Sequence, residues 1–265
     1  MESQHIYMAL QIIQSWDQEG NWEPSSDYLR NAKRLHIKPD IPNTYEVLAR
    51  DKAGSAGFIT EFESDDLIEL DCKILDLAME LLKSPNRSKA RLHINLEPST
   101  VMSDRFPEYL AKLKGSRRYK EWLVIEITER SVPDAQIDEL RNRVSEIYDV
   151  GFAIALDDYS IQAPAPHHKA LWPMASTVKV DMVELYNAGL DKMDPFNAAA
   201  ADKTVVVERI EKREEKRAIE ALKTQDIMLQ GYFFGRPEIM PDFSAQLPRS
   251  ARPNQEAGNT KKYIL

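Results

Sequence analysis

Eight short runs of β-branched and apolar residues recur along the chain, and each ends on or near a polar or charged residue. These runs span residues 34–38, 44–50, 91–95, 123–129, 152–158, 177–181, 204–208 and 227–232. Between most of them lie stretches with apolar residues at helical spacing, at 65–82, 133–150 and 212–223. Strands that alternate with helices form parallel βαβ units, so the pattern predicts an α/β fold with a mostly parallel sheet.

The spacing of the strand ends favours closure of this sheet into a TIM-like (β/α)8 barrel. From Asn95 onward the polar ends recur after 31, 31, 22, 29 and 22 residues, which matches single βα repeats. A doubly wound sheet would give similar steps, but eight units with polar ends favour the barrel. Residues 39–43 are too few for a parallel crossover between the first two runs, so we expect one antiparallel strand.

The two ends of the chain differ from this pattern. Residues 5–16 carry apolar side chains in a loosely helical stripe, and 26–34 form a second helical stretch, which together predict an N-terminal helical extension over 1–33. The barrel domain is expected to span 34–240. Residues 241–265 are rich in Pro, Ser, Asn and Ala without periodicity, which predicts a flexible C-terminal tail.

Composition excludes several classes of protein. Cys72 is the single cysteine, so the chain cannot form a disulfide scaffold or a cysteine-based zinc site. The 43 acidic residues outnumber the 35 basic ones and give a net charge of -8, which argues against a DNA or RNA polymer as partner. No signal peptide is evident, and apolar runs of about five residues are too short to cross a membrane. We therefore expect a cytoplasmic protein that is enzymatic or regulatory.

Polar side chains gather at the carboxyl ends of the predicted strands, where barrel active sites lie. These residues are Glu46, Asn95, Glu126, Asp157, Asp158, Lys179, Asp181, Glu208 and Gln230. Carboxylates at this density repel one another unless cations lie between them, and Mg²⁺ or Mn²⁺ are hard ions that prefer oxygen ligands. The adjacent Asp157 and Asp158 suit the bridging of two ions, as in two-metal phosphoryl chemistry.

In their order along the chain, these residues resemble the motifs of EAL domains, the phosphodiesterases that hydrolyse the bacterial second messenger cyclic di-GMP. The matching segments are Glu46-Val47-Leu48-Ala49-Arg50, His93-Ile94-Asn95-Leu96, Glu126-Ile127-Thr128-Glu129, Asp157-Asp158, Lys179-Val180-Asp181, Glu208-Arg209-Ile210-Glu211 and Gln230-Gly231-Tyr232. The match runs from about residue 34 to 240. The resemblance implies a barrel enzyme that uses two Mg²⁺ or Mn²⁺ ions per site to activate water and release linear pGpG.

The resemblance also implies three groups of functional residues. Those that would hold the first metal ion are Glu46, Asn95, Glu126 and Asp157, and those that would hold the second are Asp157, Asp158 and Glu208. Those implied in catalysis are Glu46, Lys179, Glu208, Glu211 and Gln230. Those in contact with substrate are Leu48, Asp158 and Arg50, with Arg50 at a phosphate. Lys179 would hold or help deprotonate the attacking water, and Glu211 and Gln230 would order the water around it.

The loop after the double aspartate departs from the family. Residues 159–168 contain no glycine and two prolines where EAL domains have a glycine-rich loop, so the backbone must follow another path. In the family this loop supports the metal site and the dimer contact, and the resemblance implies that Glu129 anchors it. His167 and His168 are expected to be solvent-exposed rather than to form a metal pair.

Two further residues lie within the matched motifs. His93 shares the strand face of Asn95 and is expected to pack inside the barrel. Arg209 stands where the family has a small glycine. We expect it to pair with Glu211 or another acid, with contact to substrate as the alternative.

These observations leave three functions open. The retained carboxylates favour a metal-dependent cyclic di-GMP phosphodiesterase, since a receptor would need Arg50 and the pocket but not a full set of metal ligands. The altered loop makes a catalytically weak or inactive cyclic di-GMP receptor, or a protein-interaction module, the alternative. The residue types also allow hydrolysis of another phosphodiester. A homodimer stays open, as does a protein partner bound through the N-terminal helix or the altered loop.

Overall fold

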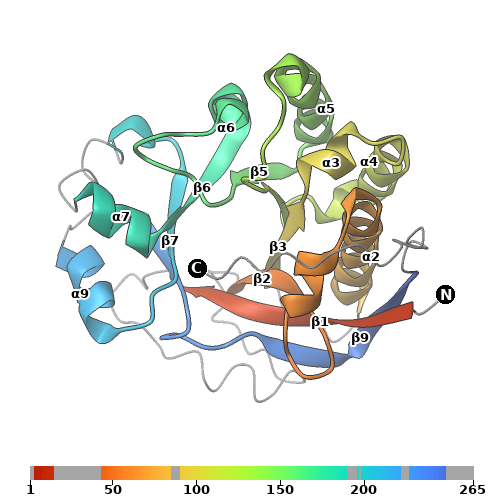
Figure 1. The fold of residues 1–265 in the computed structure, drawn as a ribbon, viewed down its shortest axis with the longest axis horizontal. Coiled ribbons are helices and arrows are strands. Elements are labelled where there is room, and N and C mark those ends of the chain that lie inside the picture. Colours follow the sequence, from red (N-terminus) through yellow and green to blue (C-terminus); the bar gives the residue numbers. More distant parts are fainter. Residues whose placement is uncertain are drawn as a thin grey trace, which may run out of the picture.

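The chain folds into a closed barrel with helices on its outside (Figure 1). The computed structural model describes residues 3–14, 43–84, 90–189, 196, 198–221 and 227–248. Within these ranges the strands form one sheet in the order β2-β3-β4-β5-β6-β7-β8-β1-β9, and a further pairing of β1 with β2 closes the barrel. The strands are β1 Ser3–Gln14, β2 Asn43–Arg50, β3 Ala90–Leu96, β4 Leu123–Ile127, β5 Ala153–Leu156, β6 Ala175–Asp181, β7 Thr204–Glu208, β8 Ile227–Gln230 and β9 Glu238–Pro248.

The direction of the strands confirms the predicted TIM-like barrel with one antiparallel member. Neighbouring strands from β2 to β8 are parallel, whereas β1 is antiparallel to both β2 and β8. The carboxyl ends of β2 to β8 therefore lie at the same end of the barrel. Residues that end these strands are brought together there, although they are far apart in the sequence.

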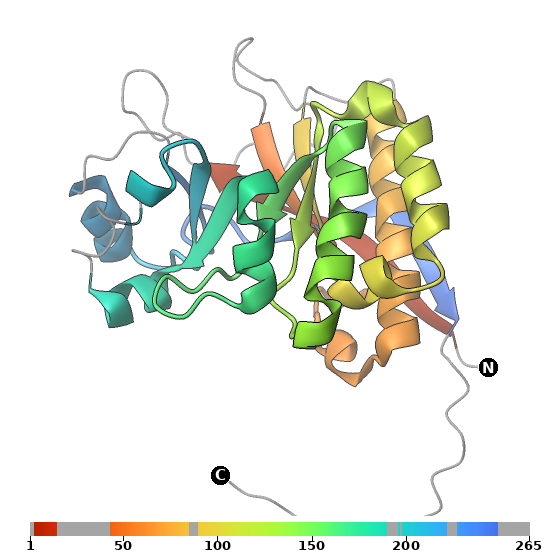
Figure 2. The same ribbon diagram turned by 90° about the horizontal axis from the view of Figure 1, so that it is seen from above.

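Helices follow the strands and cover the outside of the barrel (Figures 1 and 2). They are α2 Ser64–Lys83, α3 Pro98–Met102, α4 Phe106–Gly115, α5 Ile137–Val150, α6 Pro166–Leu171, α7 Met182–Ala188 and α9 Arg213–Ala221. The helices predicted over 65–82 and 133–150 are confirmed as α2 and α5, and α9 lies within the third. Glu63 and Asp66 form a capping box at the start of α2, which explains where this helix begins. None of the helices in the described ranges is long and apolar enough to span a membrane.

The prediction of a helix over 5–16 is wrong, because Ser3–Gln14 forms the strand β1. Ile6, Met8 and Ala9 are fully buried, and Ile13 is 2% exposed. A strand that is buried on both faces carries a continuous apolar run, which periodicity alone does not distinguish from a buried helix. The antiparallel strand of the barrel is thus β1, whereas the sequence placed it at 34–38, before the run 44–50. The strand predicted at 34–38 and the helical stretch at 26–34 lie outside the described residues.

The predicted flexible tail is also wrong over 241–248, which belong to β9. β9 pairs antiparallel with β1 along its outer edge, with Ser3 opposite Pro248 and Leu10 opposite Glu238 (Figure 1). The prolines in this segment obscured the strand in the sequence, but an edge strand tolerates proline because one row of its N–H groups has no partner strand. The folded unit therefore extends past residue 240, and residues 249–265 lie outside the described ranges.

A buried carboxyl group joins α2 to the start of α3. Asp71 is 5% exposed, and its Oδ2 accepts hydrogen bonds from the Glu97 backbone N–H at 2.9 Å and from the Thr100 hydroxyl at 2.5 Å. Burial raises the pKa of Asp71 to about 8, against the lowering effect of these two donors. Both donors use Oδ2, so Oδ1 can carry the proton of the neutral acid.

Asp71 is expected to make the protein less stable as the pH rises toward 8. Between about pH 4 and 8 the folded state keeps a proton on Asp71 that the unfolded state has released, so the free energy of unfolding falls with pH. Between about pH 5.5 and 7.5, the free energy of unfolding should fall by about 2 kcal/mol less in Asp71→Asn than in wild type. Urea unfolding at both pH values measures this, with Asp76→Asn, an exposed partner of Lys112, as the control. Equal slopes in wild type and Asp71→Asn would contradict the prediction.

Candidate active site

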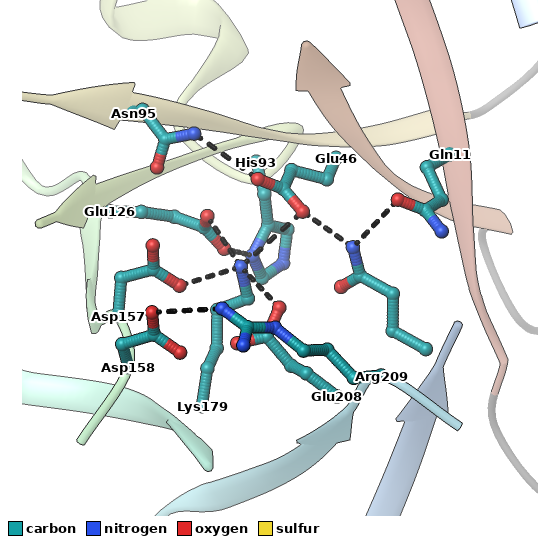
Figure 3. A network of polar contacts seen from close by, with 11 residues as sticks. Gln11, Glu46, His93, Asn95, Glu126, Asp157, Asp158, Lys179, Glu208 and Arg209 are labelled. Carbon is teal, nitrogen blue, oxygen red and sulfur yellow. Dashed lines mark hydrogen bonds and ion pairs between the residues drawn. The ribbon is translucent and has the colours of Figure 1, made fainter. Parts of the chain in front are cut away.

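Lys179 lies at the centre of a cluster of carboxylates inside the barrel mouth (Figure 3). Its side chain, from β6, is 1% exposed, and its Nζ lies 2.8 Å from Asp157 Oδ1 and 2.9 Å from both Glu126 Oε2 and Glu208 Oε1. Glu46 Oε2 is 3.4 Å away. The four acids come from β2, β4, the residue after β5, and β7, so closure of the barrel is what brings them to one ammonium group.

The electrostatics of the cluster depend on Lys179. Burial raises the pKa of Glu126 and of Glu208 well above the usual range, while the Lys179 charge opposes this shift. For Lys179 itself, burial acts to lower the pKa, but the surrounding carboxylates outweigh burial and raise the pKa well above its usual value. The charged form of Lys179 is therefore favoured, and its ammonium group contacts four acids at once.

Two amide side chains orient Glu46 and leave their own oxygens without a partner. Asn95 Nδ2 donates to Glu46 Oε1 at 3.1 Å, and Gln230 Nε2 donates to Glu46 Oε2. Within the described residues, the buried oxygens Asn95 Oδ1 and Gln230 Oε1 have no hydrogen-bond partner. An unpartnered buried acceptor is costly and indicates a missing donor, water or cation.

This donor set fits a hard divalent cation. Carboxylate and amide oxygens are the ligands that Mg²⁺ and Mn²⁺ prefer, and the acids outnumber the cations that contact them. In the described part of the chain, no three His, Cys, Asp or Glu side chains converge in the geometry of a metal site. The carboxylates instead contact Lys179, so a bound ion would have to share or take over these contacts.

A cavity of about 360 Å³ opens above the cluster. Its lining residues are Gln11, Glu46, Leu48, Arg50, Asp157, Asp158, Lys179, Glu208, Arg209, Glu211, Gln230, Gly231 and Tyr232. Nine of the predicted site residues thus meet at one cavity, while Asn95 and Glu126 contact the cluster from the barrel wall. Arg50 donates to the Ala49 carbonyl at 2.8 Å, and burial lowers its pKa.

Gln11 is a site residue that sequence reasoning missed. It lies on β1 opposite Glu46, its Oε1 is 3.5 Å from Gln230 Nε2, and its Nε2 is 3.5 Å from the Gly235 carbonyl. Its side chain lines the cavity and is shown beside Glu46 in Figure 3. The signal that could have identified it is a single polar residue inside the apolar run 6–13. The helical interpretation of this run assigned Gln11 to no face.

His93 packs inside the barrel as predicted and contacts a candidate metal ligand. Its Nδ1 lies 2.6 Å from Glu126 Oε1, and the side chain is 3% exposed. Burial and the nearby Lys179 charge lower the pKa of His93 to about 3, so the ring is neutral. The neutral ring shares this hydrogen bond with Oε1 of Glu126, while Lys179 contacts Oε2 of the same carboxyl group.

The glycine-free loop 159–168 is held by contacts other than the one predicted. Glu184 on α7 accepts a hydrogen bond from the Ser160 hydroxyl at 2.8 Å, and the Tyr159 backbone N–H donates to the Lys179 carbonyl at 2.8 Å. Glu129 is exposed, and within the described residues it makes no hydrogen bond to this loop. Burial lowers the pKa of His167, and the hydrogen bond to Thr128 and the charge of Glu129 oppose this shift. The anchoring role of Glu129 stays a prediction.

The expected exposure of His167 and His168 is wrong, since both are 1% exposed. Pro166 begins α6, and the first turn of this helix directs both rings toward the barrel wall. His167 Nε2 donates to the Thr128 carbonyl at 3.3 Å, while His168 stacks on Tyr159 with ring centroids 5.9 Å apart. Packed side chains therefore hold this loop at positions where glycines would have given a flexible backbone.

Arg209 pairs with acids, as predicted, although not with Glu211. Its Nη1 lies 2.7 Å from Asp181 Oδ2 and its Nη2 lies 3.5 Å from Asp158 Oδ2. Glu211 is exposed, and its backbone N–H donates to Glu215 at 2.8 Å. Burial and the neighbouring Asp157 raise the pKa of Asp158 to about 6, while Arg209 opposes this shift.

Comparison with known proteins agrees with this architecture. The curated relatives include cyclic di-GMP phosphodiesterase CdgJ of Vibrio cholerae, 29% identical over 200 residues, and cyclic di-GMP phosphodiesterase PdeF of Escherichia coli, 24% identical over 184 residues. The matches cover 74% and 65% of this chain but 41% and 24% of those proteins, so the chain matches less than half the length of either.

Solved structures share the fold at low sequence identity. Klebsiella pneumoniae BlrP1 in its manganese and cyclic di-GMP complex is 19% identical with a TM-score of 0.60, and the match covers 90% of this chain and 59% of that chain. The Pseudomonas aeruginosa FimX EAL domain bound to c-di-GMP is 16% identical with a TM-score of 0.59, over 88% of this chain and 90% of that chain. The EAL domain family model matches residues 44–237. From the carboxylate-lined barrel mouth and this match, we conclude that the chain belongs to the EAL domain family.

Proposed function

We propose that the protein is a metal-dependent phosphodiesterase that hydrolyses cyclic di-GMP to linear pGpG. The observation that carries the proposal is the convergence of Glu46, Glu126, Asp157 and Glu208 on one buried point, with an amide oxygen of Asn95 left without a partner. A pure receptor for an anionic dinucleotide would have no use for so many acids in its pocket. The names of the curated relatives support the same substrate.

Each residue has a role in the proposal that its position supports. Glu46, Asn95, Glu126 and Asp157 would hold one Mg²⁺ or Mn²⁺ ion, and Asp157, Asp158 and Glu208 a second. When bound, such ions lower the pKa of a coordinated water and neutralise the phosphodiester. The proposed ligands lie on β2, β3, β4 and β7 or directly after β5, and the hydrogen-bonded sheet favours a fixed arrangement of their oxygens.

The remaining residues would act on water and substrate. The surrounding carboxylates raise the pKa of Lys179, which supports a role in holding the attacking water by donation. Gln230 and Glu211 line the cavity beside it and would order nearby water. Arg50 and Leu48 form the wall beyond Glu46, where a guanidinium can bind a phosphate oxygen and an apolar side chain can contact the base or sugar.

The second candidate function is a catalytically weak or inactive cyclic di-GMP receptor. The observation that favours it is loop 159–168, which follows Asp157 and Asp158 and is packed by Glu184, His168 and Trp172 instead of being a glycine-rich turn. A loop that places these aspartates differently would weaken metal binding. We therefore expect the enzyme to need more metal than micromolar concentrations, and saturation by micromolar Mg²⁺ would contradict this.

The test is incubation of the purified protein with cyclic di-GMP and Mn²⁺ or Mg²⁺, followed by chromatography. Formation of pGpG that stops when EDTA is added supports the proposal. Tight binding without product over hours, at any metal concentration, would overturn the enzyme and favour the receptor. Hydrolysis of bis(p-nitrophenyl) phosphate but not of cyclic di-GMP would point to another phosphodiester substrate.

The proposal places the protein in the cytoplasm as a component of bacterial signalling. A homodimer stays open in it, as does a protein partner at the altered loop. The predicted N-terminal helix cannot serve as such a contact over 5–14, because these residues belong to the strand β1. Light scattering of the purified protein, with and without cyclic di-GMP, measures the oligomeric state.

A further inference from the structure

Arg209 is the residue that directly follows β7, and its side chain lies at the edge of the cavity. Its guanidinium spans two carboxylates, with Nη1 2.7 Å from Asp181 Oδ2 and Nη2 3.5 Å from Asp158 Oδ2. Figure 3 shows its contact with Asp158 beside the Lys179 cluster. The side chain is 64% exposed, whereas Asp158 and Asp181 are 32% and 15% exposed, so the arginine covers the two acids from the solvent side.

The backbone holds Arg209 in a conformation that side chains seldom adopt. Its φ is 56°, and Asp158, with φ 43°, is the other non-glycine residue with positive φ in the described part of the chain. The neighbouring Ile210 fixes this geometry, because its N–H donates to the Gln230 carbonyl and its carbonyl accepts from Phe233. Glycine or asparagine would be more favourable at such a position, so the arginine adopts this conformation against a backbone preference.

The acids at the barrel mouth are divided between two tethered cations. Lys179 contacts Glu46, Glu126, Asp157 and Glu208, and Arg209 contacts Asp158 and Asp181. A guanidinium does not lose its proton in a protein, so Arg209 stays charged at every working pH. A divalent ion on Asp158 would therefore meet a fixed positive charge that already uses one of the Asp158 oxygens.

We infer that Arg209 competes with a second divalent ion for Asp158, so that the protein holds one ion well and the second weakly. This inference rests on the proposed metal site, but it concerns a residue that the metal-ligand set does not include. Arg209 thereby becomes a specificity-determining residue for the number of metal ions. The alternative is that Arg209 binds a substrate phosphate. In that case, replacing Arg209 would leave metal binding unchanged when no substrate is present.

The experiment measures Mn²⁺ binding without nucleotide, by titration calorimetry and by the electron paramagnetic resonance signal of free Mn²⁺. Wild type is expected to bind a first ion at least about tenfold more tightly than a second. In Arg209→Gly the second ion should tighten by at least about tenfold while the first is unchanged. Arg209→Asn, which also tolerates positive φ, should behave in the same way, and Arg209→Lys should restore the wild-type difference.

Arg141→Ala is the matched control, because Arg141 forms an exposed ion pair with Asp138 on α5. A thermal melt checks that each variant is folded. Equal affinities for both ions in wild type, or a second-ion affinity unchanged in Arg209→Gly and Arg209→Asn, would overturn the inference. If pGpG is still formed in that case, the inference fails alone, whereas no Mn²⁺ binding and no pGpG in any variant would overturn the proposed function with it.

Discussion

Replacing Glu46 with glutamine is expected to lower kcat for cyclic di-GMP hydrolysis by on the order of 10³-fold or more. Glu46 accepts from Asn95 and Gln230 and contacts Lys179, so three donors point at one carboxylate. Glutamine keeps the shape but removes the negative charge. Its NH₂ group would also face a donor, because both oxygens of Glu46 are used as acceptors. The variant would lose a proposed metal ligand and the hydrogen bonds that orient Glu46.

The loss is measured by chromatography of pGpG at saturating Mn²⁺ and substrate. Glu108→Gln is the control, since Glu108 is an exposed acid on α4 that pairs with Arg105 and Lys112 away from the cavity. It should keep wild-type turnover and show only a small change in melting temperature. Glu46→Gln with turnover within about tenfold of wild type would remove Glu46 from the catalytic set.

Replacing Lys179 with methionine is expected to destabilise the metal-free protein by about 3–5 kcal/mol. Methionine follows the lysine side chain as far as Cε but leaves Glu46, Glu126, Asp157 and Glu208 without the cation that they share. Removing one partner of a buried charge cluster costs more than the cluster contributes as a whole, since the remaining charges stay buried. Urea unfolding in the presence of EDTA measures the loss.

The pH and metal dependence of Lys179→Met separate this charge effect from lost packing. Lys179 opposes the raised pKa of Glu126 and of Glu208, so without Lys179 these two acids keep protons in the folded state that the unfolded state releases, and the loss grows as the pH rises from about 5 to 8. Mn²⁺ should restore more stability to the variant than it adds to wild type. Lys114→Met, at an exposed position on α4, is the control. A loss that is independent of pH and metal would contradict the assigned role.

Much of the site could be predicted because strand ends are local features of a sequence. Glu126, Asp157 and Glu208 each follow a short apolar run, and in a parallel barrel such positions must share one end. Residue type then indicated the chemistry, since acids at this density require cations. The Lys179 contacts follow the same logic, although their distances depend on how the barrel closes.

Residues whose positions depend on long-range pairing could not be predicted in this way. Gln11 lies beside Glu46 only because β1 inserts between β2 and β8, and its apolar run reads equally well as a helix. His167 and His168 are buried because α6 places them in contact with Thr128 and Tyr159. Thr128 is distant in the sequence, and no sequence pattern predicted the contact with Tyr159. The left-handed backbone of Arg209 follows from the hydrogen bond between Ile210 and Gln230.

By itself, the sequence determined the α/β class, the parallel strands and the acidic barrel mouth, because apolar periodicity and the residue at each strand end are properties of short segments. Only the tertiary structure decided that residues 3–14 close the barrel as an antiparallel strand, that β9 extends the sheet, and that Lys179 and Arg209 divide the acids between them. These features arise from contacts between segments far apart in the chain, where burial and charge compensation outweigh local preference.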